Sequence, residues 1–155
     1  MNKIAETIGE ICKIVLPIHE EFFFGNPNSK TAICTLASLN LLKSMKNSDI
    51  LENVEIVGRL LSENKGIDEI IRYVYRKKNI KKIIICGHEV WGHKAGHSLI
   101  QLHKNGTDNN SKIIGSKSPN PVLSVKKSEI NYFQKEIKLV NLIGETNPEK
   151  ISQHI

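Results

Sequence analysis

The sequence predicts an α/β domain of Rossmann-like, doubly wound architecture, with a mostly parallel sheet and helices on both of its faces. Two observations lead to this fold class. Residues 82–86 read Lys-Ile-Ile-Ile-Cys, a nearly continuous apolar run that is typical of a strand buried on both faces of a parallel sheet. Short apolar runs also alternate with segments of helical periodicity, as βαβ units require. The length of 155 residues suits a single domain.

The N-terminal segment is predicted to form an amphipathic helix. Its apolar side chains recur at helical spacing, namely Ile4, Ile8, Ile11 and Val15. Pro17 follows them and is expected to end the helix, because proline cannot continue the backbone hydrogen bonding. We therefore expect residues 1–21 to be a helical extension and residues 22–155 to be the α/β domain.

The remaining elements are expected in alternation, after a turn-forming loop at residues 25–29. Strands are expected at residues 31–36, 54–57, 82–86 and 112–115. Helices are expected around residues 67–74, 99–105 and 130–137, with a short last helix that starts at Pro148 behind the N-cap Asn147. Two segments stay open between alternatives: residues 39–49 are a helix or a loop, and residues 139–144 are the tail of a helix or a last strand.

The composition argues against several classes of function. The net charge is +6, but the lysines are spread over the chain and no basic run is interleaved with aromatic residues, so we expect no nucleic-acid partner. No apolar stretch approaches the roughly 20 residues of a spanning helix, and no signal peptide is evident, so no membrane insertion is expected. The three cysteines lie far apart, as is typical of reduced thiols in a cytoplasmic protein.

Ligands of open α/β sheets bind where loops leave the carboxyl ends of the strands. Four such loops are expected, at residues 37–40, 59–65, 87–96 and 116–121. The third loop and the helix after it carry most of the ionisable side chains of interest: His88, Glu89, His93, His97 and His103. Histidine is the commonest metal ligand, and four histidines after one buried strand predict a ligand site rather than a chance cluster.

Two metal chemistries stay open from the residues alone. One is a zinc or transition-metal site of a hydrolase or metal-binding protein, although His88, Glu89 and His93 miss the HExxH spacing by one residue. The other is axial ligation of a bound metallo-macrocycle: cobalamin modules use Asp-x-His-x-x-Gly, of which His93 and Gly96 supply His-x-x-Gly while Trp91 stands in the Asp place. A phosphate-binding loop is excluded, because neither GxGxxG nor GxxxxGK[ST] occurs.

A longer string favours the second chemistry. Residues 86–108 read CGHEVWGHKAGHSLIQLHKNGTD. They resemble the signature of the family of tetrahydromethanopterin S-methyltransferase A subunits, Cys-Gly-x-Glu-Val-x-Gly-His-x-x-Gly-Gln-[ST] followed by Leu-His-x-Asn-Gly-x-Asp. Further similarity is carried by CTLAS at residues 34–38, by SENKGI at residues 62–67 and by the C-terminal stretch from residue 132, so that it covers residues 22–155 in one colinear register.

Three departures from the family pattern are visible. His97 stands where the family has Gln, Ala37 stands where it has Gly, and SKSPNP at residues 116–121 replaces a Gly-Ala-Ile-Pro type of loop. The chain also ends without the anchor helix of the membrane-bound members. The resemblance therefore implies a soluble, cytoplasmic homologue from a methanogenic archaeon.

The resemblance implies a corrinoid-binding methyl carrier, part of a methyltransferase that relays a methyl group from methyl-tetrahydromethanopterin to coenzyme M. Its cofactor would be cobalamin or a related cobamide, and separate methyl-donor and methyl-acceptor proteins would be its partners. His93 would be the axial cobalt ligand, with Glu63 as the first choice to accept its other N–H and Glu89 as the second. The remaining residues expected at the cofactor are Thr35, Ser38, Ser62, Asn64, Gly87, Gly92, Gly96, Gly115 and Ser116.

Overall fold

The computed structural model describes residues 21–155, which contain a five-stranded sheet with the order β1-β3-β2-β4-β5. The strands are β1 (Phe22–Phe24), β2 (Thr31–Cys34), β3 (Ile56–Gly58), β4 (Lys82–Gly87) and β5 (Lys138–Ile143). All neighbours pair in parallel except β1, which runs antiparallel to β3 and sets Phe23 opposite Val57. The predicted α/β class with a mostly parallel sheet is confirmed.

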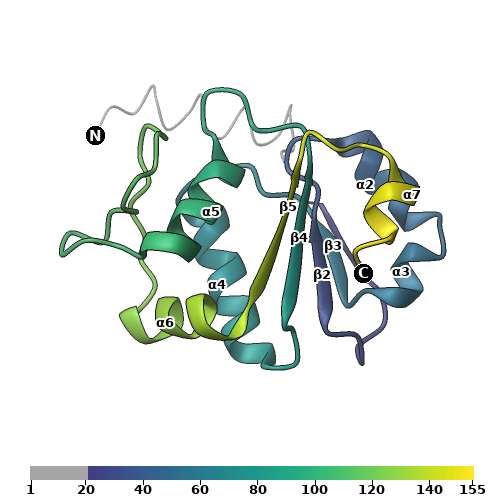
Figure 1. The fold of residues 1–155 in the computed structure, drawn as a ribbon, viewed down its shortest axis with the longest axis horizontal. Coiled ribbons are helices and arrows are strands. Elements are labelled where there is room, and N and C mark those ends of the chain that lie inside the picture. Colours follow the sequence, from purple (N-terminus) through teal and green to yellow (C-terminus); the bar gives the residue numbers. More distant parts are fainter. Residues whose placement is uncertain (1–20) are drawn as a thin grey trace, which may run out of the picture.

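Helices cover both faces of this sheet (Figure 1). On one face lie α4 (Lys65–Lys77), α5 (Ala95–Asn105) and α6 (Lys127–Glu136), and on the other lie α2 (Leu39–Lys46), α3 (Ile50–Asn53) and α7 (Pro148–Ser152). Side chains of a strand alternate between the two faces. In β4, for example, Ile83 and Ile85 join the core cluster under α4 and α5, while Ile84 and Cys86 join the cluster under α2. This double burial explains the apolar run in the sequence.

The direction of winding reverses between β2 and β4. From β2 the chain moves outward to β3, and it then crosses back to place β4 on the other side of β2. This order is consistent with the expected Rossmann-like, doubly wound arrangement. Such a reversal leaves a crevice between the loops that follow the two central strands, where open α/β sheets bind ligands. The loop that leaves β4 arches above the sheet at the top of Figure 1.

The structure corrects two expectations. Residues 112–115 are not a strand of the sheet: Lys112 and Ile113 form only isolated bridges with Val122 and Thr107, because this segment folds back on its own loop. Strand β1 was not expected, since three consecutive phenylalanines show no alternation of apolar and polar residues. Of the two open segments, residues 139–144 belong mostly to β5, and residues 39–46 form α2.

The helix expected over residues 4–15, and with it most of the proposed extension over residues 1–21, lies outside the described residues. The remaining predicted helices are present at nearly the expected positions, and Asn147 does cap α7, since its side chain accepts from the N–H groups of Glu149 and Lys150. No helix in residues 21–155 combines the length and apolar character needed to cross a bilayer.

Candidate functional site

The loop after β4 and the loop after β3 meet through a histidine–carboxylate pair. The Nδ1 atom of His93 lies 2.8 Å from Oε2 of Glu63. Glu63 is almost fully buried, with 2% of its side chain exposed, whereas 54% of the His93 side chain is exposed. The buried carboxylate therefore fixes one nitrogen of a ring whose other nitrogen, Nε2, has no hydrogen-bond partner among the described residues. This is the pairing expected from the sequence, with Glu63 rather than Glu89 as the partner.

The second oxygen of Glu63 is held as well. Oε1 accepts from the backbone N–H of Asn120 at 2.9 Å, and the carbonyl of Asn120 accepts from the side chain of Asn64 at 3.2 Å. Burial acts to raise the pKa of the Glu63 carboxyl, but the hydrogen bonds from its own backbone N–H, from Asn120 and from His93 outweigh burial and hold the pKa below its usual range. Glu63 is therefore held as a carboxylate, which can accept a hydrogen bond from the Nδ1–H group of His93.

The main chain of His93 is fixed by a cluster of hydroxyl groups. Ser118 donates from Oγ to the carbonyl oxygen of His93 at 2.5 Å, and its own oxygen lies within hydrogen-bond distance of Ser98. Ser98 is fully buried on α5, and its Oγ lies 2.7 Å from Oγ of Ser116. The loop over residues 116–120 thus forms hydrogen bonds to both His93 and Glu63. Ser118 binds the main chain of His93, and the backbone of Asn120 binds the carboxylate of Glu63.

Glu89 has a different role from the one considered in the sequence. Its two oxygens accept from the backbone N–H groups of Val90, Gly96 and His97 at 2.8–2.9 Å. Two of these donors belong to the first turn of α5, whose N-cap residue makes no side-chain hydrogen bond. Glu89 therefore supplies the missing cap, because a carboxylate at a helix N-terminus satisfies free N–H groups and the positive end of the dipole. The carboxylate that is hydrogen-bonded to the ring of His93 is that of Glu63, not that of Glu89.

Three glycines shape the loop between β4 and α5 in different ways. Gly87 and Gly92 both adopt positive φ angles, of 77° and 78°. A Cβ atom at Gly87 would collide with the carbonyl oxygen of Thr35, whereas nothing lies within 4 Å of the corresponding position at Gly92. Gly96 is packed inside α5 against Leu36. The space beside His93 is therefore open at Gly92 and closed at the other two glycines.

This difference gives a testable prediction. Gly87→Ala combines a strained backbone with a steric clash and should lower the free energy of unfolding by about 3 kcal/mol. Gly92→Ala has the same φ angle but no clash and should cost only about 1 kcal/mol. Urea denaturation of both variants measures the two values. Equal losses would contradict the crowding at Gly87.

The other expected site residues divide into two groups. Ser38 and Ser62 lie beside the site, where Ser38 accepts from the N–H of His88 and Ser62 accepts from the N–H of Gly66 at the start of α4. Thr35 and Gly115 are turned away from the pair: Thr35 is buried and donates to the carbonyl of Gly58, and the position of a Cβ at Gly115 faces the side chain of Gln101. Whether these residues touch a cofactor stays a prediction.

The remaining histidines do not gather with His93 into a metal centre. His103 is structural, because its Nε2 atom lies 2.7 Å from the carbonyl oxygen of Ile137 and its ring packs edge-on against Phe133. The Nε2 atom of His97 is buried without a partner. Within residues 21–155, no three His, Cys, Asp or Glu side chains are grouped so that they could hold a metal ion. The zinc alternative therefore gains no support.

The tip of the loop carries an unusually exposed aromatic side chain. Trp91 precedes Gly92 and exposes 96% of its surface, more than any other large apolar side chain in the described part of the chain. The loop therefore carries an exposed indole two residues before an exposed imidazole, and that imidazole is paired with a buried carboxylate.

Sequence reasoning missed the contributions of Ser98, Ser118 and Asn120. Ser98 matches the family signature, and the loop SKSPNP, which departs from it, contains Ser118 and Asn120, so the sequence did mark their neighbourhood. Nothing in the residue types indicated that the backbone N–H of Asn120 would bind Glu63, because every non-proline residue offers the same donor.

Comparison with known proteins decides the family. The family model that describes the A subunit of tetrahydromethanopterin S-methyltransferase matches residues 13–155. The chain belongs to this family. The match covers the whole sheet and every residue of the site described above.

Individual members of this family show the same relationship. The A subunit of a putative methyltransferase Mtx from Methanosarcina acetivorans is 34% identical over 136 residues, which are 87% of this chain and 65% of the relative. The protein of the same name from Methanosarcina barkeri is 36% identical over 132 residues, 84% of this chain and 63% of the relative. The first of two tetrahydromethanopterin S-methyltransferase A subunits from Methanothermobacter thermautotrophicus is 31% identical over 140 residues, 89% of this chain and 57% of the relative. The chain thus spans less than two thirds of the length of these relatives.

Proposed function

We propose that this chain is the corrinoid-binding component of a methyltransferase and that Nε2 of His93 is the axial ligand of the corrinoid cobalt. The observation that carries the proposal is the pairing of His93 Nδ1 with the buried carboxylate of Glu63 at 2.8 Å. A metal-ligating histidine usually donates its other N–H to a carboxylate or carbonyl, which fixes the tautomer and the orientation of the ring. Membership in a family of methyltransferase subunits supports the same interpretation.

The residues present fit a flat, bulky cofactor. His93 is more than half exposed, and the space beside Gly92 is open. The pair lies beside the point where the winding of the sheet reverses, which is where such folds bind ligands. A corrin ring needs this combination of a protruding imidazole and an unobstructed backbone, because its face must come close to the loop.

When bound, the corrinoid supplies cobalt that carries a methyl group between a donor and an acceptor. The chain contributes a ligand of fixed geometry. Glu63 would keep the proton on Nδ1 and thereby leave the lone pair of Nε2 for the cobalt, while Ser118 holds the main chain of His93 in place. We propose methyl-tetrahydromethanopterin as the methyl donor and coenzyme M as the acceptor, with separate proteins that bring each of them to this edge of the sheet.

Reconstitution tests the proposal. The purified chain is incubated with hydroxocobalamin, unbound cofactor is removed by gel filtration, and cobalt and protein are quantified together with the absorption spectrum. We expect a red protein with about one cobalt per chain, because one axial histidine accepts one cobalt atom. A parallel incubation with zinc should leave no bound metal. A chain that emerges colourless, or that retains zinc instead, would contradict the proposed function.

A further inference from the structure

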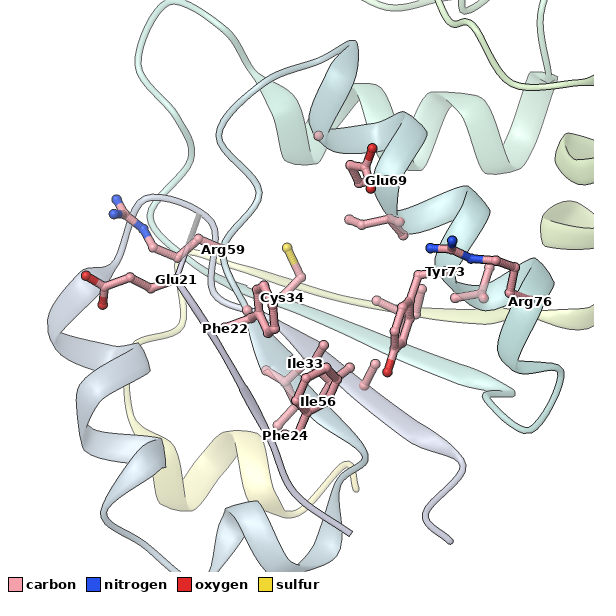
Figure 2. Close-up of a pocket in the computed structure, with 16 residues that line it drawn as sticks. Glu21, Phe22, Phe24, Ile33, Cys34, Ile56, Arg59, Glu69, Tyr73 and Arg76 are labelled. Atoms are coloured by element: carbon pink, nitrogen blue, oxygen red, sulfur yellow. The ribbon is translucent and has the colours of Figure 1, made fainter. Parts of the chain in front are cut away.

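A second feature lies away from the histidine site, on the face of the sheet that carries α4. An apolar groove with a volume of about 390 Å³ runs between α4 and the β1–β3 edge of the sheet. Figure 2 shows Phe22, Phe24 and Ile56 on its sheet side and Tyr73 on its helix side. The groove is apolar because the helical layer on this face ends at α4, while the sheet continues to β3 and β1.

Strand β1 presents its largest side chains to this groove. Phe22 and Phe24 are 53% and 59% exposed, and their rings meet edge to face at 5.3 Å. They share one face of β1, whereas Phe23 points to the opposite face and packs against the core cluster under α2. Removing apolar surface from water is favourable, so a cover over the exposed parts of both rings would be stabilising. No element within residues 21–155 provides that cover.

We propose that residues 4–16 of this chain dock in the groove as an amphipathic helix. Four of their apolar side chains lie on one helical face, namely Ile4, Ile8, Ile11 and Val15. The opposite face carries Glu6 and Glu10, which would stay in solvent. This apolar stripe could pack against the two exposed rings of β1.

The length of the segment and its point of attachment fit the groove. A helix over residues 4–16 has 13 residues, the same number as α4, and would extend about 20 Å. Pro17 ends it, and residues 17–20 connect it to Glu21, which itself lines the groove. Connections of two to six residues are usual between a helix and a strand. A connection of this length is enough to bring the segment to the groove.

The attachment also favours this segment over a second copy of the chain. A partner joined by a short linker is present at an effective concentration of the order of 1 mM, far above that of a free copy at ordinary protein concentrations. Only residues 17–20 separate the segment from Glu21, which lines the groove. An intramolecular contact is thus the least costly way to cover Phe22 and Phe24.

Nuclear Overhauser effects in the full chain test the proposal. We expect contacts between the methyl groups of Ile8 or Ile11 and the ring protons of Phe22, Phe24 or Tyr73. A sample that mixes labelled and unlabelled chains separates contacts within a chain from contacts between chains. Intramolecular contacts support the proposal. It would be overturned by their absence, or by contacts that occur only between chains, which would assign the groove to a dimer.

A pair of variants provides an independent measurement. Ile11→Asp places a carboxylate on the apolar face and should increase amide exchange at Phe22–Phe24 about tenfold, because the edge strand loses its cover. Gly9→Asp adds the same charge to the opposite face and should leave exchange unchanged. Equal behaviour of the two variants would contradict docking through this face. If Ile11→Asp unfolds the protein, the contacts measured in the unmodified chain still decide the question.

Discussion

His93→Ala should abolish the axial nitrogen ligand of a reconstituted corrinoid. The electron paramagnetic resonance spectrum of the cobalt(II) form should lose the splitting that a coordinated nitrogen produces, and the cobalt(III) absorption spectrum should move to that of a corrinoid without a lower base. Corrinoid affinity should fall by at least about tenfold, as it does when the support of a metal ligand is removed. The variant should still bind some corrinoid, because other parts of the cofactor would contact the protein independently of His93.

The matched control is His88→Ala. His88 lies in the same loop and is exposed, but the structure gives its ring no carboxylate partner among residues 21–155. Its removal should leave both spectra unchanged. Because the space beside Gly92 is open, free imidazole should enter the position vacated in His93→Ala and restore the nitrogen splitting. If His88→Ala changes the spectra and His93→Ala does not, the ligand is misassigned. If neither changes them, axial ligation by this loop is wrong.

Glu63→Gln should change which nitrogen of His93 carries the proton. A glutamine at this position keeps one oxygen to accept from the N–H of Asn120 and turns its NH₂ group toward Nδ1 of His93. Nδ1 must then accept, so the proton moves to Nε2, where it blocks ligation. We expect corrinoid affinity to fall by about 10–100-fold. Nitrogen-15 shifts of the cofactor-free protein at about pH 8, above the ordinary pKa of imidazole, report the tautomer directly.

The same substitution should alter the pH dependence of stability. The pKa of Glu63 in the folded chain lies below its ordinary value of 4.5. The carboxylate therefore contributes stability that is fully present above pH 4.5 and is lost as the pH falls through the lower, folded-state pKa. Glu63→Gln removes this contribution, so its unfolding free energy should fall less steeply with acid than that of the unmodified chain. Parallel acid-dependence curves, together with an unchanged tautomer, would show that Glu63 does not act on His93.

Strands that are buried on both faces of the sheet could be predicted from the sequence. Segments whose conformation depends on pairing with a distant part of the chain could not. The run Ile83–Ile85 identified β4 because both faces of a central parallel strand need apolar side chains. Strand β1 escaped prediction because Phe22–Phe24 becomes a strand only by pairing with β3. Residues 112–115 have strand composition, yet they pair within their own loop, which local sequence cannot specify.

The candidate site shows the same division. Topology brings the loops after β3 and β4 to one edge of the sheet, and the family resemblance singled out His93 in the second loop. Its pairing with Glu63 in the first loop could therefore be predicted. The supporting contacts of Ser118 and Asn120 were hidden, because they use hydroxyl and backbone groups that occur throughout the chain. Glu89 is the opposite case. Its closeness to His93 in the sequence made it a candidate partner, but its carboxylate instead accepts hydrogen bonds from the first N–H groups of α5.

The exposure of Trp91 gives the protein an optical reporter of its own. It is the single tryptophan of the chain, and it lies at the tip of the loop that carries His93. Light that excites indole selectively therefore reads the surroundings of this loop without any label. Since 96% of its surface faces water, its emission should start at long wavelength, and a molecule that covers the indole should shift that emission toward the blue or quench it. The rate at which a coloured cofactor or a partner protein binds to this loop can thus be measured by stopped-flow fluorescence with the unmodified chain.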